Sequence, residues 1–367
     1  MVLKFLLPLQ ELFSYIPEMN KYIEEVHPRK VTQEYLASVS GKISHINISK
    51  DIEEGLFKPN WDMLDRSKSN IRPLIFLLAI GGLNKEPKDF VKYAALVEMI
   101  HNGTLIHDDI EDNAEIRRGG KPIHLKYGVD VAVNSANILY FSPFLLLKKY
   151  CAEMKKEKQI RVYNLLIEHL NRVTWGQAVD IYWHNNYKIP SVEEYLQMCA
   201  YKTGAIDGLV FSLAASLADI SDKKYEELKL FGEKFGTVLQ IHDDFSDVCS
   251  LEREAIGGKI VGNDIREGKK SIINLIALNK LKSEKRSMLL EILKEHTKDM
   301  NKISKAIDLI IKSGALEITL SLIKGQIADL KNDSKKVFNG KYSSLMIDFL
   351  KGMEDDIECK SKETHGL

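Results

Sequence analysis

The sequence predicts an all-α protein made of a single domain. Apolar residues recur at helical spacing from one end of the chain to the other, and we find no segment with the strict alternation of a half-buried strand. No stretch has the composition of a linker between domains. Two aspartate-rich segments, each at the polar end of an apolar helical run, form the candidate functional site of the predicted bundle. We therefore expect one helical domain.

The predicted helices are separated by prolines, glycines and polar loops. They cover residues 9–26, 31–47, 72–83, 93–106, 130–151, 157–183, 192–220, 224–247, 271–280, 283–297, 300–312, 315–332 and 341–354. Pro28 separates the first two, and the Arg72-Pro73 dipeptide opens the third, because proline suits the first helical turn. Residues 48–65 are polar and receive no assignment.

Polar sequence also marks the later loops and the C-terminus. The segment from Gly257 to Lys270 is rich in glycine and charge and is predicted to be a loop, and the tail after Glu358 is expected to be disordered. We divide the chain into an N-terminal helical extension at residues 1–48, a main domain at 49–358 and a flexible tail at 359–367.

Composition limits the classes of partner. The 52 basic and 52 acidic residues cancel, so no overall electric field favours nucleic acid or an anionic membrane surface. No apolar run approaches the roughly 20 residues of a membrane span, and the N-terminus lacks the features of a signal peptide. The four cysteines have no metal-ligand spacing and are expected to be reduced thiols. We expect a cytoplasmic protein without a membrane span or a nucleic-acid partner.

The first aspartate-rich segment follows the helix predicted over residues 93–106. On a helix Asp108 and Asp112 share a face, while Asp109 lies to one side. Like charges at this spacing repel by roughly 0.2–0.5 kcal/mol, so they favour a bound cation. Oxygen ligands suggest Mg²⁺, whose coordination is typically completed by substrate phosphates.

The second segment repeats the pattern at the end of the helix predicted over residues 224–247. Asp243 and Asp247 again stand four residues apart after an apolar run. A single acidic cluster is more often a solvated helix end, but two clusters at the ends of two apolar helices are harder to explain in that way. Facing each other, they would hold several Mg²⁺ ions around a diphosphate.

Two other metal sites fit the sequence less well. An EF-hand would need a glycine and a terminal glutamate at fixed positions, which the segment around Asp108 lacks. A di-iron bundle would need two Glu-x-x-His pairs, and Glu98 with His101 forms one pair without a second on a suitable helix.

The two segments resemble the aspartate-rich motifs of the trans-prenyltransferases, or isoprenyl diphosphate synthases of the polyprenyl synthetase family. The short spacing of the first motif, followed by Arg117-Arg118-Gly119, is similar to that of eukaryotic-type geranylgeranyl diphosphate synthases. The resemblance extends from about Ile71 to Leu275. It implies the isoprenoid synthase fold, a bundle of long helices around a central cavity, and a homodimer. The implied reaction joins an allylic diphosphate to isopentenyl diphosphate.

The resemblance also implies roles for individual residues. The ligands of an expected three Mg²⁺ ions would be Asp108, Asp109, Asp112, Asp243, Asp244 and Asp247. The allylic diphosphate would contact Arg117, Lys202, Thr203, Gln240, Lys259 and Lys269. Isopentenyl diphosphate would contact Arg72, His101 and Arg118, while Gln177 and Asp180 would line the reaction cavity. Ionisation of the allylic C–O bond would depend on these metal ligands together with Arg117, Lys202 and Lys269. The departing pyrophosphate would remove the final proton.

One position departs from the family pattern. A lysine that binds isopentenyl diphosphate is expected three residues before Arg72, where this chain has Ser69. Lys68 would replace it only if the loop shifted by one residue. Loss of this cation is also what a terpene synthase would show, since that enzyme ionises an allylic diphosphate without condensing it. A non-catalytic partner subunit, the third hypothesis, predicts eroded aspartates, and here they are intact.

Chain length is expected to depend on the residues below the first aspartates. Gly103 and Thr104 are too small to stop a fifteen-carbon chain, and Tyr140 and Phe141 match family residues that form a lower floor. For two aromatic residues in a helix, an ordinary place in the core is an equally good interpretation. With the floor at this depth, the predicted product is geranylgeranyl diphosphate, with twenty carbons.

Overall fold

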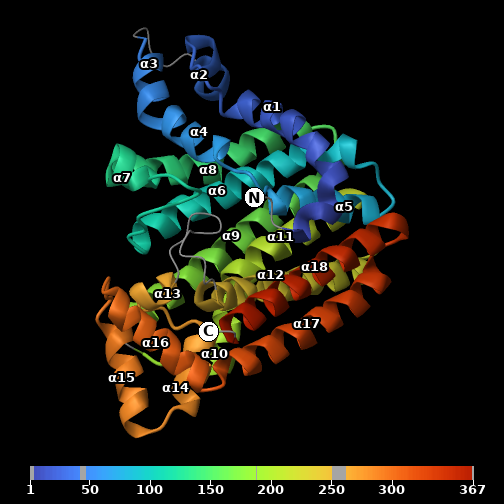
Figure 1. Ribbon diagram of the computed structural model, residues 1–367. Helices are drawn as coiled ribbons and strands as arrows, with labels where there is room; N and C mark the ends of the chain where they lie inside the picture. The colour runs from blue at the N-terminus through green and yellow to red at the C-terminus, as the bar shows by residue number, and fades with distance from the viewer. Residues whose placement is uncertain (1–3, 42–46, 187, 250–261, 366–367) are drawn as a thin grey trace.

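Four long apolar helices form the centre of the molecule (Figure 1). They are α5 (Ile71–Gly82), α6 (Val91–Glu111), α11 (Thr203–Ala218) and α12 (Asp222–Cys249). The computed structural model describes residues 4–41, 47–186, 188–249 and 262–365, and no β-strand occurs within these ranges. α11 is buried from Gly204 to Ala218, because α5, α9 and α12 all pack on it. The all-α fold predicted from the sequence is confirmed.

The remaining helices surround this centre. They are η1 (Lys4–Tyr15), α1 (Ile16–Val26), α2 (Gln33–Ser40), α3 (Ser49–Ile52), η2 (Glu53–Phe57), α4 (Lys58–Asp65), η3 (Pro87–Phe90), α7 (Ile123–Tyr127), α8 (Val129–Tyr150), α9 (Lys156–Asn185), α10 (Val192–Tyr201), α13 (Asn263–Arg266), α14 (Ile272–Lys280), α15 (Ser283–Lys294), α16 (Met300–Lys312), α17 (Ala315–Val337) and α18 (Gly340–His365). α8 and α9 lie against α6 and α11 respectively, and α17 and α18 pack on α12.

The prediction of a single helix over residues 192–220 is wrong, because the helix is interrupted at Lys202. The backbone leaves helical geometry there, with ψ at −87°, and α10 and α11 run on either side. Gly176 of α9 packs against the break so closely that a Cβ at this position would lie 2.3 Å from the Lys202 nitrogen. The break turns the Lys202 side chain toward the aspartates at the end of α6.

Other boundaries differ at the N-terminus and in the loops. In the region where a helix was predicted over residues 31–47, the observed helix α2 ends at Ser40, because Gly41 adopts a φ of 75°. The unassigned residues 48–65 form α3, η2 and α4. Within the loop predicted at 257–270, α13 forms one short helix, and residues 250–261 lie outside the described ranges.

The tail predicted to be flexible at residues 359–367 is helical in this structure as far as His365. α18 continues to that residue, because polar contacts fix its last turns against α12. Lys360 Nζ donates to Ser246 Oγ at 2.9 Å and to Asp356 Oδ2 at 2.7 Å. The Thr364 hydroxyl, on a residue that is 3% exposed, donates to the Cys249 carbonyl.

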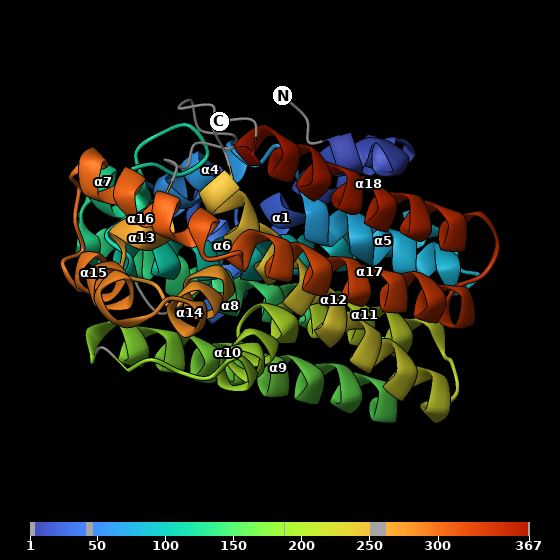
Figure 2. The same ribbon diagram turned by 60° about the horizontal axis from the view of Figure 1, so that its bottom comes forward.

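The described part of the N-terminal extension joins the same bundle. η1 packs on α18 and α5, and α1 packs on α6 and α8. Phe5 makes edge-to-face contacts with His242 of α12 and Phe349 of α18. The N-terminal and C-terminal helices therefore lie side by side, as Figure 2 shows with η1 in blue beside α18 in red.

Among the described helices, α8 is long and apolar enough to cross a membrane by length and composition, although the sequence analysis found no such run. This is weak evidence, because a core helix of a globular protein passes the same test. α8 packs along α6 and α7, as a core helix does.

Candidate active site

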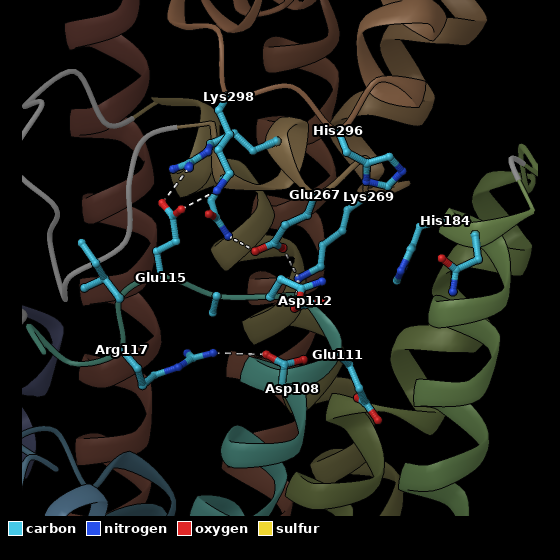
Figure 3. A pocket seen from close by; sticks show the side chains of 16 residues that line it. Asp108, Glu111, Asp112, Glu115, Arg117, His184, Glu267, Lys269, His296 and Lys298 are labelled. Atoms are coloured by element: carbon cyan, nitrogen blue, oxygen red, sulfur yellow. Dashed lines mark hydrogen bonds and ion pairs between the residues drawn. The ribbon is translucent and has the colours of Figure 1, made fainter. Parts of the chain in front are cut away.

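A cleft of about 360 Å³ opens at the C-terminal end of α6 (Figure 3). Its walls come from the loop after α6, the end of α9, and the segment from α13 to the start of α16. The lining is mostly charged, and includes Asp108, Glu111, Asp112, Glu115, Arg117, His184, Arg266, Glu267, Lys269, His296 and Lys298. The first aspartate motif thus lies in a polar cavity.

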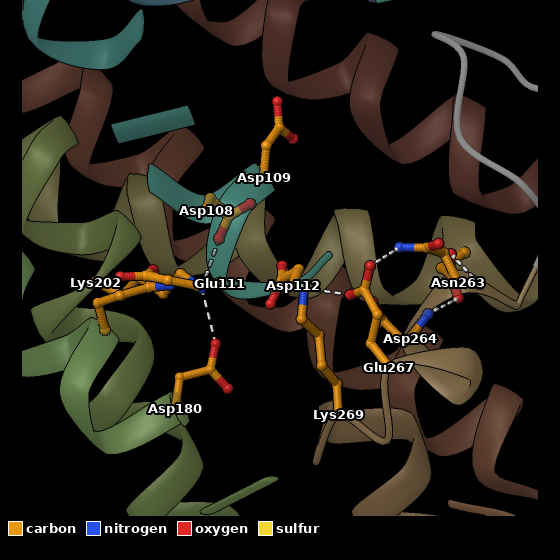
Figure 4. Close-up of polar contacts among 12 residues, drawn as sticks. Asp108, Asp109, Glu111, Asp112, Asp180, Lys202, Asn263, Asp264, Glu267 and Lys269 are labelled. Carbon is orange, nitrogen blue, oxygen red and sulfur yellow. Dashed lines mark hydrogen bonds and ion pairs between the residues drawn. The ribbon is translucent and has the colours of Figure 1, made fainter. Parts of the chain in front are cut away.

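Asp108 lies between an arginine and a lysine. Its Oδ2 accepts from Arg117 Nη2 at 3.3 Å, and its Oδ1 accepts from Lys202 Nζ at 3.2 Å. Lys202 Nζ also donates to Asp180 Oδ2 at 2.8 Å (Figure 4). Asp180 is buried, and the Lys202 ammonium holds the pKa of its carboxyl below the usual value despite that burial.

Asp112 has a lysine partner of its own. Lys269 Nζ lies 2.6 Å from Asp112 Oδ2 and 2.7 Å from Glu267 Oε2 (Figure 4). Burial raises the pKa of Asp112 to about 7, although the neighbouring Lys269 acts in the opposite direction. In this structure the ammonium groups of Lys202 and Lys269 therefore act as counterions to the predicted metal ligands.

Asp109 points away from this arrangement (Figure 4). Its Oδ1 accepts from Arg117 Nε at 2.6 Å, and its side chain is 1% exposed. Burial raises its pKa to about 6 against the effect of Arg117. In this structure Asp109 orients Arg117, whose other end reaches Asp108, and the metal role predicted for Asp109 stays a prediction.

A tight turn presents the two arginines of the first motif. Arg117 and Gly120 exchange backbone hydrogen bonds, and Arg118 adopts a φ of 52° between them. Arg66 Nη1 donates to the Arg117 carbonyl at 2.8 Å, so Arg66 holds the turn in place. Sequence analysis missed Arg66, because its partner is 51 residues away. Arg118 Nη1 donates to Asn102 Oδ1 at 2.7 Å.

The three aspartates of the second motif have different surroundings. Asp243 is exposed. Asp244 is buried, and its carboxylate accepts from the Tyr195 hydroxyl, from Gln240 Nε2 at 2.9 Å and from the Ile272 backbone at 3.1 Å. These three donors occupy both oxygens. Asp244 therefore joins α10, α12 and α14 in this structure, and its predicted metal role stays a prediction.

The Asp247 carboxylate also accepts hydrogen bonds from the backbone. Its two oxygens accept from the amide groups of Asn263 and Asp264, each at 3.1 Å, which fixes the start of α13. The metal role predicted for Asp247 likewise stays a prediction. Asp243 is the exposed member of the second motif, and the three aspartates of this motif are not among the residues that line the cleft.

The residues predicted to contact isopentenyl diphosphate gather on another side of α6. Arg72 Nη1 lies 3.1 Å from His101 Nε2, and Arg72 Nη2 lies 3.3 Å from Asp207 Oδ2. Burial and the nearby arginines hold the pKa of His101 well below its usual value, so its ring is neutral. Near the start of α5, Lys68 is exposed and Ser69 is half-buried.

The remaining predicted contacts within the described residues lie on α9, α11 and α12. Gln177 Nε2 donates to Glu111 Oε2 at 2.6 Å, and Glu111 is a cleft residue that the sequence analysis did not single out. Thr203 Oγ1 donates to Gln240 Oε1 at 2.6 Å. Lys259 lies outside the described residues.

The two aromatic residues predicted as the tunnel floor point in different directions. Tyr140 is half-buried beside His107, with its hydroxyl 3.4 Å from His107 Nδ1. Its ring would lie 3.6 Å from a Cβ at Gly103, so α6 and α8 approach closely there. Thr104 is half-buried one residue further on. The Phe141 side chain is 64% exposed, so the prediction that it forms a floor within this chain is wrong.

The donor set at the cleft suits a hard cation. Carboxylate oxygens from Asp108 and Asp112 are ligands that Mg²⁺ prefers. In the part of the chain that the structure describes, no three His, Cys, Asp or Glu side chains stand together as a metal site. Instead, Lys202 contacts Asp108 and Lys269 contacts Asp112.

The acidic end of α6, with Arg117, Lys202 and Lys269 on its aspartates, defines a cleft in this all-helical bundle that suits a diphosphate group bound with metal ions. Comparison with known proteins agrees with this class. A family model described as polyprenyl synthetase matches residues 54–310. The chain therefore belongs to the polyprenyl synthetase family, and it is a trans-prenyltransferase.

Individual relatives confirm the predicted resemblance to geranylgeranyl diphosphate synthases. The chain is 34% identical to the short chain isoprenyl diphosphate synthase of Methanocaldococcus jannaschii over 71% of this chain and 77% of the relative. It is 33% identical to the geranylgeranyl pyrophosphate synthase of Dictyostelium discoideum over 65% and 75%. The structure of geranylgeranyl pyrophosphate synthetase from Pyrococcus horikoshii superposes with a TM-score of 0.79 at 24% identity, covering 96% of this chain and 98% of that one.

Proposed function

We propose that this protein is a Mg²⁺-dependent geranylgeranyl diphosphate synthase. It condenses isopentenyl diphosphate with allylic diphosphates up to farnesyl diphosphate and releases the twenty-carbon product. The observation that carries the proposal is the placement of Lys202, Lys269 and Arg117 directly on Asp108 and Asp112. Named relatives support it, and a solved polyprenyl synthase from Caulobacter crescentus is described as complexed with calcium and isoprenyl diphosphate.

Asp108, Asp112 and Asp243 would hold the metal ions, and we expect three of them. Bound Mg²⁺ supplies the Lewis acidity that neutralises charge on a departing pyrophosphate. The chain's own cations supply the rest: Lys202, Lys269 and Arg117 leave their aspartates and bind the allylic diphosphate, where charge develops as the C–O bond breaks. Pyrophosphate then accepts the proton lost from the condensed product.

The decisive experiment is an incubation of the purified protein with Mg²⁺ and farnesyl diphosphate, with and without labelled isopentenyl diphosphate. Label in a twenty-carbon diphosphate is the expected result. Hydrocarbon or alcohol formed from farnesyl diphosphate alone, with no label incorporated, would contradict the proposal and indicate a terpene synthase. The relatives, which are named as synthases of isoprenyl diphosphates, do not favour that alternative.

The Mg²⁺ requirement is expected to depend on pH. Metal binds the ionised form of Asp112, whose pKa is raised to about 7, so a proton must leave before the ion binds. The concentration of Mg²⁺ for half-maximal condensation should therefore rise about tenfold from pH 8 to pH 6. Titrating activity with Mg²⁺ at several pH values tests this. The Asp112→Asn variant is the control, and it should need more Mg²⁺ but lose most of the pH dependence. A wild-type requirement that stays constant over this range would contradict the prediction.

We also propose that the enzyme is a homodimer joined through α8 and α9. The 30-residue α9 carries a stripe of large side chains, each more than half exposed, at spacings of seven or eight residues. They are Ile160, Ile167, Trp175 and Tyr182. Val133 and Phe141 are exposed at a spacing of eight residues on α8. Apolar stripes at this spacing suit packing against helices of a second copy.

Replacing Ile167 with aspartate should disrupt this dimer. Burial of a charge in an apolar helix interface is costly, so we expect the dissociation constant to rise about 100-fold or more. Sedimentation equilibrium measures the change. Leu230→Asp, at an exposed apolar position on α12, is the matched control and should leave the assembly unchanged. An unaltered dimer in Ile167→Asp would place the interface elsewhere.

The reaction is proposed to take place in the cytosol. Cys151, Cys199 and Cys249 are buried thiols outside any disulfide, as expected for a reducing compartment.

A further inference from the structure

α11 contains a buried acid that the mechanism above does not use. Asp207 is the one charged residue in this apolar helix, and it is 0% exposed. An ionised carboxylate without a partner would be strongly destabilising at such a site. The residue therefore needs a compensating cation, and Arg72 of α5 provides it, with Nη2 3.3 Å from Asp207 Oδ2.

Close packing restricts where the Asp207 carboxylate lies. α12 passes beside it with Gly232 and Gly236, whose missing side chains make room for this contact. A Cβ at Gly236 would lie 2.9 Å from Asp207 Oδ2, and one at Gly232 would lie 2.7 Å from the Asp207 carbonyl oxygen. Any larger residue at either glycine would push Asp207 away from Arg72.

Arg72 connects Asp207 to His101. The guanidinium places Nη2 on Asp207 and Nη1 against the neutral imidazole, so contacts from two helices fix its plane. Arg72 Nε and Asp207 Oδ1 are buried without a hydrogen-bond partner. The Arg72 side chain as a whole is 13% exposed, so part of it is uncovered although Nε is buried.

We propose that Asp207 is the positioning residue for Arg72, and that this fixed guanidinium offsets the missing lysine at Ser69 in binding isopentenyl diphosphate. This inference rests on the proposed function. A guanidinium already held in place loses less conformational entropy on binding a diphosphate than a flexible lysine does. The Asp207 carboxylate lies behind Arg72 and orients it.

The test compares Asp207→Asn with the wild type. Asparagine keeps the shape but removes the charge that orients Arg72, so KM for isopentenyl diphosphate should rise about tenfold. KM for farnesyl diphosphate should change less than about twofold, because Lys202 and Lys269 bind that substrate. Calorimetry with isopentenyl diphosphate alone should show the same weakening. Ser216→Ala, another buried polar position on α11, is the matched control for altered packing.

The Arg72→Lys variant tests the same ion pair, between Arg72 and Asp207, by changing the arginine. A lysine cannot contact Asp207 and His101 together, so this variant should also raise KM for isopentenyl diphosphate, and less so in the Asp207→Asn background. Additive effects would overturn the positioning role. So would unchanged or tighter binding of isopentenyl diphosphate by Asp207→Asn in an enzyme that still condenses, since the acid would then compete with the substrate. A wild-type protein that neither binds nor incorporates isopentenyl diphosphate would overturn the proposed function as well.

Discussion

Replacing Asp108 with asparagine is expected to lower kcat/KM for condensation about 1,000-fold. Asp108 contacts both Arg117 and Lys202, and it is one of three proposed metal ligands. Asparagine has the same shape, so the loss would come from charge. Steady-state kinetics over a range of Mg²⁺ concentrations would also show a higher Mg²⁺ requirement.

Asp109→Asn is the matched control for this experiment. Asp109 is buried against Arg117, so its loss should reduce activity by loosening that arginine, without a change in the Mg²⁺ requirement. Equal shifts in the Mg²⁺ requirement for the two variants would contradict the assignment of Asp109 away from the metal.

Replacing Tyr140 with alanine is expected to shift the main product beyond twenty carbons. The ring is half-buried against α6, close to Gly103, so its removal opens space below the first aspartates. Incubation with farnesyl diphosphate and excess labelled isopentenyl diphosphate, followed by separation by chain length, measures the shift.

Phe141→Ala serves as the comparison, because that side chain is 64% exposed. It should leave the product length unchanged. An unchanged product spectrum in Tyr140→Ala, or lengthening by Phe141→Ala alone, would contradict the floor assigned to Tyr140.

The sequence predicted the architecture well, because apolar periodicity is a local property. The helix that carries Asp243 was predicted over residues 224–247 and is observed at Asp222–Cys249, whereas the helix predicted over 93–106 continues to Glu111 and so includes Asp108. The break at Lys202 was missed. Thr203 and Gly204, which follow the break, are poor helix formers but do not by themselves end a helix, and Gly176 of another helix packs against the break.

The candidate site was predicted less completely, since a motif names residues without their surroundings. Asp244 and Asp247 match the pattern of metal ligands, yet backbone amides and the Tyr195 hydroxyl take up their oxygens. Asp207 and Arg66 carried no local signal, because each acts through a partner on a distant helix.

The pairing of η1 with α18 bears on how the protein is made. The first described helix of the chain packs on the last, and both support α12 near His242. A ribosome adding 5–20 residues per second needs roughly 20–70 s for 367 residues, and η1 lacks its partner α18 until that helix has been synthesised. This side of the bundle therefore closes only after α18 has been made. A nascent chain stopped before α18 would expose Phe5 and the back of α12, and it would be a substrate for chaperones and proteases.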